Sequence, residues 1–127
     1  MGKRILVIED DPSTRRYFSF LFEKEGYQVA LASNGLEGLR MAQQDPPDLL
    51  ILDVMLPGLD GFEVCHRLRS EPATAKLPIV MLSAKGQDAD KVTGLKVGAN
   101  VFFTKPVDRQ VLLDTVSKLL AEQPEDS

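Results

Sequence analysis

The sequence of 127 residues predicts an α/β fold in which a five-stranded parallel sheet is covered by helices on both faces. Five short apolar runs alternate with five longer segments whose apolar residues recur at helical spacing. The third and fourth runs are apolar throughout, which is typical of strands buried on both faces. Because crossovers between parallel strands are right-handed, the alternation favours a doubly wound sheet.

The first strand and the first helix have clear boundary signals. Residues 4–8 (RILVI) form a short apolar run. Asp11 follows as an N-cap, and Pro12 suits the first helical position because its missing N–H would have no partner there. Gly26 ends the helix, since glycine adopts the left-handed conformation without strain. Residues 27–31 are then expected to form the second strand.

The second helix begins with a capping box. Asn34 is the N-cap, and Glu37 stands three residues further on. The pair Pro46-Pro47 ends this helix before the third strand, which we expect at residues 49–52. The helix is expected to turn three apolar side chains inward: Leu36, Leu39 and Ala42.

The third helix repeats the capping pattern of the second. Residues 60–63 (DGFE) begin it, with Val64 and Leu68 on its buried face. The fully apolar run at residues 79–82 is the fourth strand.

The last three elements complete the alternation. A fourth helix is indicated by the spacing of Val92, Leu95 and Ala99, although Gly94 weakens it. Residues 101–104 form the fifth strand, and Asp108 caps the last helix. Its inward residues are expected to be Leu112, Val116, Leu119 and Leu120.

The composition argues against several classes of protein. With 15 Lys and Arg against 19 Asp and Glu, the net charge is −4, which gives no electrostatic reason to expect direct binding of nucleic acid. Cys65 is the only cysteine, so an internal disulfide is excluded and a cytoplasmic location is expected. The apolar runs are too short to span a membrane. We expect one domain at residues 1–122, with 123–127 as a polar tail or the start of a linker.

Polar side chains stand at the ends of four predicted strands. Glu9 and Asp10 follow the first, Asp53 ends the third, Ser83 follows the fourth and Lys105 follows the fifth. Ligands of doubly wound sheets bind beyond these carboxyl ends. If the first and third strands are neighbours, three carboxylates meet there and repel one another, so they need a cation or raised pKa values. Mg²⁺ is suited to such oxygen ligands, and the whole set favours a phosphoryl group on one carboxylate.

Each of these residues also has an ordinary structural explanation. Asp10 could simply cap a helix, Asp53 could be a polar strand end, and Lys105 could be a solvated loop residue. For Asp11 we favour the role of helix cap. His66 is most simply a surface histidine. The placement of polar groups at four strand ends together is harder to explain by structure alone.

Four segments resemble the receiver domains of two-component response regulators, in the order of that family. They are ILVIEDD at residues 5–11, LDVMLPGLDG at residues 52–61, Ser83-Ala84 and Lys105-Pro106. The resemblance covers about residues 3–122. It implies a flavodoxin-like sheet in the order 2-1-3-4-5.

The resemblance also implies a role for each site residue. Asp53 would accept a phosphoryl group from the phosphohistidine of a sensor histidine kinase or a phosphotransfer protein. Glu9, Asp10, Asp53 and the backbone carbonyl of Met55 would hold Mg²⁺. Lys105 would pair with a phosphoryl oxygen, and its peptide bond to Pro106 would be cis.

A conformational switch is implied as well. Ser83 would move to donate to the phosphoryl group, and Phe102 would turn inward into the space that Ser83 leaves. The surface of the fourth helix, fifth strand and fifth helix would then change and control a downstream target or a fused output domain. Phe102 stands where tyrosine is frequent, so the coupling would depend on packing alone.

Two other functions are alternatives to a switch. A phosphatase with an aspartate nucleophile would carry a second Asp two residues after Asp53, where this sequence has Met55, which cannot transfer a proton. A flavin-binding domain would need a phosphate-binding loop after the first strand, and residues 9–11 (EDD) would repel the phosphate.

The expected partners follow from the switch function. The length leaves no room for an output domain, so we expect a stand-alone receiver or one cut from a longer protein. Charges that commonly pair across receiver dimers are replaced by residues such as Val111 and Thr115. The surface instead offers Val101 and Phe102, so a monomer or a weak apolar dimer is expected.

Overall fold

The computed structural model describes residues 2–84 and 88–122, so the expected tail at 123–127 lies outside the described residues. The strands are β1 (Arg4–Ile8), β2 (Gln28–Ala32), β3 (Leu49–Asp53), β4 (Ile79–Ser83) and β5 (Val101–Thr104). The helices are α1 (Pro12–Lys24), α2 (Gly35–Gln44), α3 (Gly61–Arg69), α4 (Asp88–Val97) and α5 (Arg109–Ala121). All strand pairs are parallel, and the order is β2-β1-β3-β4-β5, as predicted.

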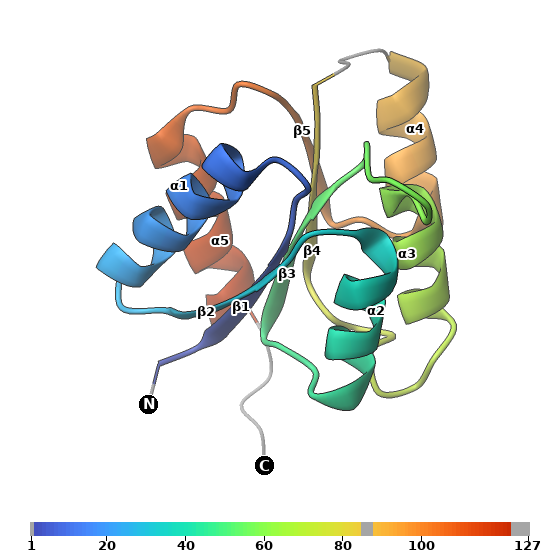
Figure 1. Cartoon of the computed structure of the whole chain (residues 1–127), viewed down its shortest axis with the longest axis horizontal. Coiled ribbons are helices and arrows are strands. Elements are labelled where there is room, and N and C mark those ends of the chain that lie inside the picture. Colours follow the sequence, from blue (N-terminus) through green and yellow to red (C-terminus); the bar gives the residue numbers. More distant parts are fainter. Residues whose placement is uncertain (1, 85–87, 123–127) are drawn as a thin grey trace.

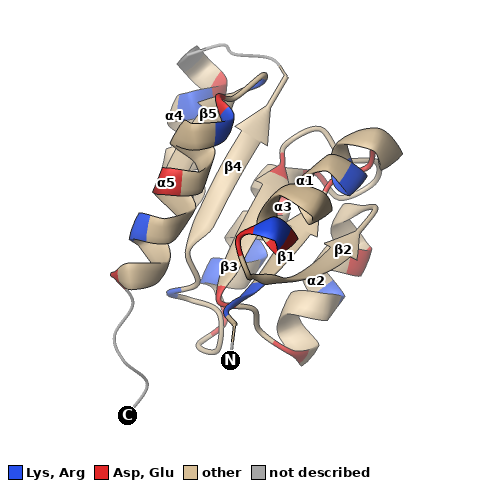
Figure 2. Cartoon of the chain, turned by 90° about the vertical axis from the view of Figure 1, so that its left-hand side faces the viewer, with Lys and Arg blue, Asp and Glu red and all other residues tan. Residues whose placement is uncertain are grey.

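The sheet separates two layers of helices. Helices α1 and α5 cover one face, and α2, α3 and α4 cover the other (Figure 1). Alternate residues of each strand enter opposite cores: Ile5 and Val7 pack with α1 and α5, whereas Leu6 and Ile8 pack on the other face. Basic and acidic residues are interspersed along the helices (Figure 2). Among the described residues, no helix is long and apolar enough to cross a membrane.

The helix starts follow the capping signals. The side chains of Asp11, Asn34, Asp60 and Asp108 each accept a hydrogen bond from the backbone N–H three residues further on. Gly26 ends the first helical segment at φ +94°, in the left-handed region. Strand β2 begins one residue later than predicted because the N–H of Tyr27 still donates to the carbonyl of Phe22 (3.2 Å).

The prediction that Leu36 turns inward is wrong, since 46% of it is exposed. The buried face of α2 consists of Gly35, Gly38, Leu39 and Ala42. A Cβ atom on Gly35 would lie 2.0 Å from the carbonyl oxygen of Leu59. The two glycines therefore let α2 approach its neighbours closely, and Leu36 is left on the outer side.

Helix α4 packs differently from the sequence prediction. Val92 and Leu95 are 58% and 43% exposed, and Ala99 is buried but lies beyond the helix. Gly94 is buried, and a Cβ atom there would lie 2.7 Å from the Phe102 ring and 2.9 Å from the Met81 sulfur. The glycine that weakens the helix is thus its point of closest approach to the sheet.

Gly61 fixes the distance between α3 and the end of β3. Its N–H donates to the carbonyl of Val54 (3.0 Å). A Cβ atom on Gly61 would lie 2.4 Å from the carbonyl oxygen of Asp53 and 2.8 Å from the Cα of Val54. These are backbone atoms, so a side chain at this position would have to displace the strand end.

We therefore predict that Gly61→Ala lowers the free energy of unfolding by about 1–3 kcal/mol, as overpacking does. Helix propensity alone would give the opposite sign, because alanine is favoured over glycine by about 1 kcal/mol inside helices. Urea unfolding of the two proteins measures the difference. A stabilised variant would show that the contact with the end of β3 is not tight.

Candidate functional site

The parallel register brings four strand ends to one edge of the sheet. Leu52 pairs with Ile8 of β1, Asp53 with Leu82 of β4, and Ser83 with Thr104 of β5. The residues that end each strand or directly follow it therefore meet in space. They are the residues singled out from the sequence: Glu9, Asp10, Asp53, Ser83 and Lys105.

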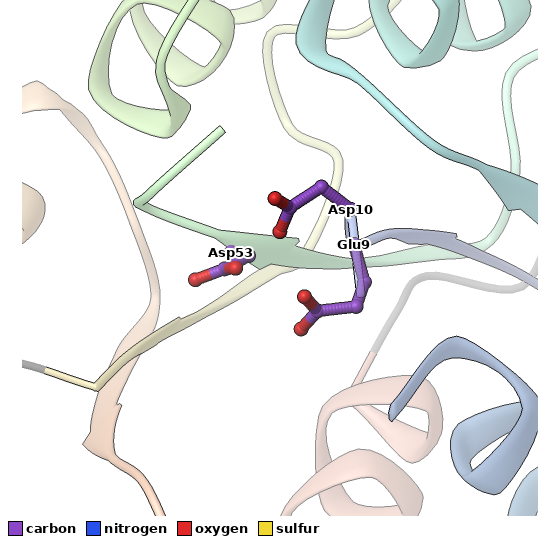
Figure 3. A group of neighbouring side chains, drawn as sticks. All are labelled: Glu9, Asp10 and Asp53. Atoms are coloured by element: carbon purple, nitrogen blue, oxygen red, sulfur yellow. The ribbon is translucent and has the colours of Figure 1, made fainter. Parts of the chain in front are cut away.

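Three carboxylates converge at the ends of β1 and β3 (Figure 3). Glu9, Asp10 and Asp53 each offer an oxygen, and these oxygens all lie within 4.8 Å of one another. Glu9 and Asp53 are buried, at 2% and 4% exposed, while Asp10 is exposed. Solvent therefore reaches the site from the side of Asp10, while Glu9 and Asp53 form its buried floor.

Lys105 places a positive charge beside the two buried carboxylates. Its Nζ lies 2.7 Å from Oε1 of Glu9 and 3.5 Å from Oδ2 of Asp53. Burial would lower the pKa of Lys105, but the hydrogen bond to Glu9 and the charges of both carboxylates outweigh it, and the pKa is raised. The lysine is therefore charged and bonded mainly to Glu9.

Asp53 is destabilised as a carboxylate. Burial and the neighbouring Glu9 raise its pKa from 3.8 to about 6, although Lys105 and the N–H of Met55 act in the opposite direction. The N–H of Met55 donates to Oδ1 of Asp53 (3.3 Å). A further cation near the three carboxylates would favour the ionised form.

The residues beside the carboxylates complete the edge. Ser83 is fully buried, and its carbonyl accepts a hydrogen bond from the N–H of Lys105 (2.8 Å). The bond between Lys105 and Pro106 is cis, as the resemblance implied. Met55 follows β3 and is 50% exposed.

Phe102 is not a surface residue in this structure. It is 8% exposed and packs in the core between the sheet and α4. The expectation that it forms part of an exposed apolar surface is therefore wrong. The physical reason is Gly94, whose missing side chain leaves room for the ring.

One contact at the site was missed by the sequence reasoning. Nη1 of Arg15 donates to the carbonyl oxygens of Glu9 (2.9 Å) and Asp10 (3.2 Å). The only signal was spacing: residue 15 lies one helical turn after the Asp11 cap, where a long side chain can reach back to the preceding loop.

The cluster of three carboxylates suits a hard divalent cation. Glu9, Asp10 and Asp53 offer oxygen ligands from two strand ends, and a bound cation would offset the repulsion among them. Lys105 and the buried Ser83 stand beside this cluster. This arrangement can bind a phosphoryl group and neutralise its charge.

Comparisons with known proteins point the same way. Residues 5–117 match the family of response regulator receiver domains. Protein PilH of Pseudomonas aeruginosa is 38% identical over 118 residues, which cover 93% of this chain and 98% of PilH.

Two solved structures give the same fold. Chemotaxis protein CheY4 of Vibrio cholerae is similar with a TM-score of 0.87 and 31% identity, over 94% of this chain and 99% of that one. The receiver domain of sensor histidine kinase PA1611 from Pseudomonas aeruginosa, crystallised with a magnesium ion in its active site cleft, has a TM-score of 0.89 and 27% identity, over 96% and 100% of the two chains.

Several curated relatives are longer proteins. The chain spans 43–48% of the length of the matching transcriptional regulators, among them RpaA and PhoP. Because the family match covers most of the sequence and PilH is matched along almost its entire length, the chain belongs to the response regulator receiver domain family.

Proposed function

We propose that this receiver domain is a switch that accepts a phosphoryl group on Asp53 from a phosphohistidine, borne by a sensor histidine kinase or a phosphotransfer protein. The observation that carries the proposal is the position of Asp53. Asp53 ends the central strand β3, so it lies between the carboxylates that follow β1 and Ser83 at the end of β4. Its Oδ2 is also 3.5 Å from Nζ of Lys105. A phosphoryl group on Asp53 would have a charged lysine and a buried hydroxyl residue at the same sheet edge.

Glu9, Asp10 and Asp53, with the carbonyl of Met55, are the proposed Mg²⁺ ligands. The cation would neutralise phosphoryl charge during transfer. The magnesium ion in the PA1611 receiver domain supports this assignment. The remaining functional groups belong to the chain: Asp53 is the nucleophile, and Lys105 would exchange part of its contact with Glu9 for a phosphoryl oxygen.

The output of the switch is proposed to be the α4-β5-α5 surface. Ser83 stands at the end of β4, and its carbonyl accepts a hydrogen bond from the N–H of Lys105. A movement of Ser83 toward the phosphoryl group would therefore also displace the start of the loop after β5. Strand β5 also carries Phe102, which packs against Gly94 of α4. Because the ring is already inside, we propose that α4 shifts against it while Phe102 keeps its place.

A phosphatase activity is not favoured. The residue two positions after Asp53 is Met55, which is exposed at the site but has no proton to give. The downstream partner is proposed to be a separate target or a fused output domain, without direct binding of nucleic acid by this chain. A location in the cytoplasm, with no membrane attachment, belongs to the same proposal.

With Mg²⁺ and acetyl phosphate, the chain should gain one acid-labile phosphoryl group, and Asp53→Asn should gain none. Intact-mass spectrometry measures the labelling. Asp45→Asn is the matched control, because Asp45 is an exposed carboxylate at the end of α2. Equal labelling of wild type and Asp53→Asn would overturn the assignment of the phosphoacceptor.

The pKa of Asp53 predicts a pH dependence in the absence of Mg²⁺. Between 3.8 and about 6 the folded chain holds a proton on Asp53 that the unfolded chain has lost, so stability falls as pH rises through this window. Asp53→Asn lacks the group. The stability of wild type relative to this variant should therefore fall across the window, as urea unfolding on either side of it can show. Saturating Mg²⁺ should reduce the loss, and a relative stability that rises with pH would contradict the account.

The lifetime of the phosphorylated form should depend on Met55. Hydrolysis needs a water aligned with the bond between Asp53 and phosphorus, and the thioether gives that water no strong hydrogen bond. Met55→Asn should therefore speed the loss of phosphoryl label in a chase by mass spectrometry. An unchanged or slower rate would count against the prediction. The resemblance to receiver domains implies that Met55 and Lys85 flank this water, but Lys85 lies outside the described residues.

The activated form should be a monomer or a weak apolar dimer. On the proposed output surface, Val92, Leu95 and Val111 are each more than 40% exposed, so an apolar contact is available there. Light scattering with beryllofluoride as a phosphoryl mimic should show either no association or a weak association that does not weaken further as salt rises. A tight dimer that dissociates at high salt would instead indicate an interface of ion pairs.

A further inference from the structure

Arg15 reaches back from the first turns of α1 to the loop that carries two acidic side chains. Its Nη1 donates to the carbonyl oxygens of both Glu9 (2.9 Å) and Asp10 (3.2 Å). Its own N–H donates to the carbonyl of Asp11 (2.9 Å), as part of the helix start. The side chain is half-buried, so part of its length is packed against the protein.

The two carbonyl groups belong to consecutive residues just beyond β1, whose pairing with β3 ends at Ile8 and Leu52. Glu9 is also held by its N–H bond to Ala32 (3.0 Å) and by Lys105. Asp10 is exposed and lies one residue further from the sheet. Because the Arg15 guanidinium donates to both carbonyl oxygens, it fixes the orientation of the two peptide groups. These peptide groups set the direction in which the side chains of Glu9 and Asp10 leave the backbone.

We propose that Arg15 is a positioning residue for Mg²⁺ binding, acting through the backbone of Glu9 and Asp10; the proposal rests on the metal-dependent function above. Groups that orient metal ligands typically change metal affinity by roughly 10–100-fold when they are removed. Arg15 acts on the ligand backbone, so we expect a loss of about tenfold, at the lower end of that range.

Charge and geometry predict opposite signs for the loss of Arg15. Arg15 is cationic, and removing a positive charge near a Mg²⁺ site should by itself tighten binding. Removing the hydrogen bonds to the loop should weaken binding. The sign of the change therefore separates a positioning role from a general electrostatic one.

The test is a Mg²⁺ titration of the whole chain by isothermal titration calorimetry at constant ionic strength. Arg15→Met keeps most of the aliphatic length and removes the guanidinium, and it should weaken Mg²⁺ binding about tenfold. Arg16→Met is the matched control, since Arg16 is an exposed neighbour on the same helix and the charge change is identical. Its affinity should stay within about twofold of wild type, because exposed charges are screened. Arg15→Lys should lie between wild type and Arg15→Met.

Thermal unfolding without Mg²⁺ separates folding from positioning. A purely structural Arg15 would lower the melting temperature and leave the affinity of the folded chain unchanged, which would overturn the proposal. Binding by Arg15→Met that equals or exceeds that of Arg16→Met would overturn it too, while the proposed function stands. If wild type itself bound no Mg²⁺, the metal-dependent function and the inference would both be wrong. If Arg15→Met does not fold, Arg15→Lys decides: affinity equal to wild type contradicts the proposal.

Discussion

The repulsion among three carboxylates at one edge of the sheet is the constraint on which the site depends. Glu9 and Asp53 are buried, and the oxygens of Glu9, Asp10 and Asp53 lie within 4.8 Å of one another. Lys105 is nearer to Glu9 than to Asp53, so it offsets only part of the repulsion. The pKa of Asp53 is raised first by its burial and then by the neighbouring charge of Glu9. A cation would stabilise such a cluster of carboxylates, and the bound cation would in turn favour binding of a phosphoryl group.

The sheet connects the site at the end of β3 to helix α4 through strands β4 and β5. Asp53 pairs in register with Leu82, and Ser83 pairs with Thr104, so the site is directly connected to the ends of β4 and β5. Strand β5 carries Phe102 into the contact with Gly94 of α4. Packed cores respond to displacements by shifting whole elements, since they contain little free space. The path from Asp53 to α4 is therefore short and consists of neighbouring strands.

Most of the fold could be predicted from the sequence because local signals agree with one another. Asp11, Asn34, Asp60 and Asp108 mark helix starts by a bond that involves only neighbouring residues. The convergence of Glu9, Asp10 and Asp53 was predictable once the strands were inferred to be parallel and the first and third to be neighbours, an order that the resemblance to receiver domains implied.

The failures concern tertiary contacts. The exposure of Leu36 and the burial of Phe102 depend on how closely Gly35 and Gly94 let helices approach, and periodicity carries no information on that distance. Arg15 was missed because its partners are backbone carbonyls, which every residue possesses.

The central claim is that burial and the charge of Glu9 destabilise the ionised form of Asp53, and that a bound cation stabilises it. The most direct measurement is a pH titration of its side-chain carboxyl carbon by NMR, with and without Mg²⁺. The account predicts a pKa of about 6 without the ion and a clear decrease when it is added. A pKa near the ordinary value of 3.8 in both conditions, or one that Mg²⁺ leaves unchanged, would contradict it.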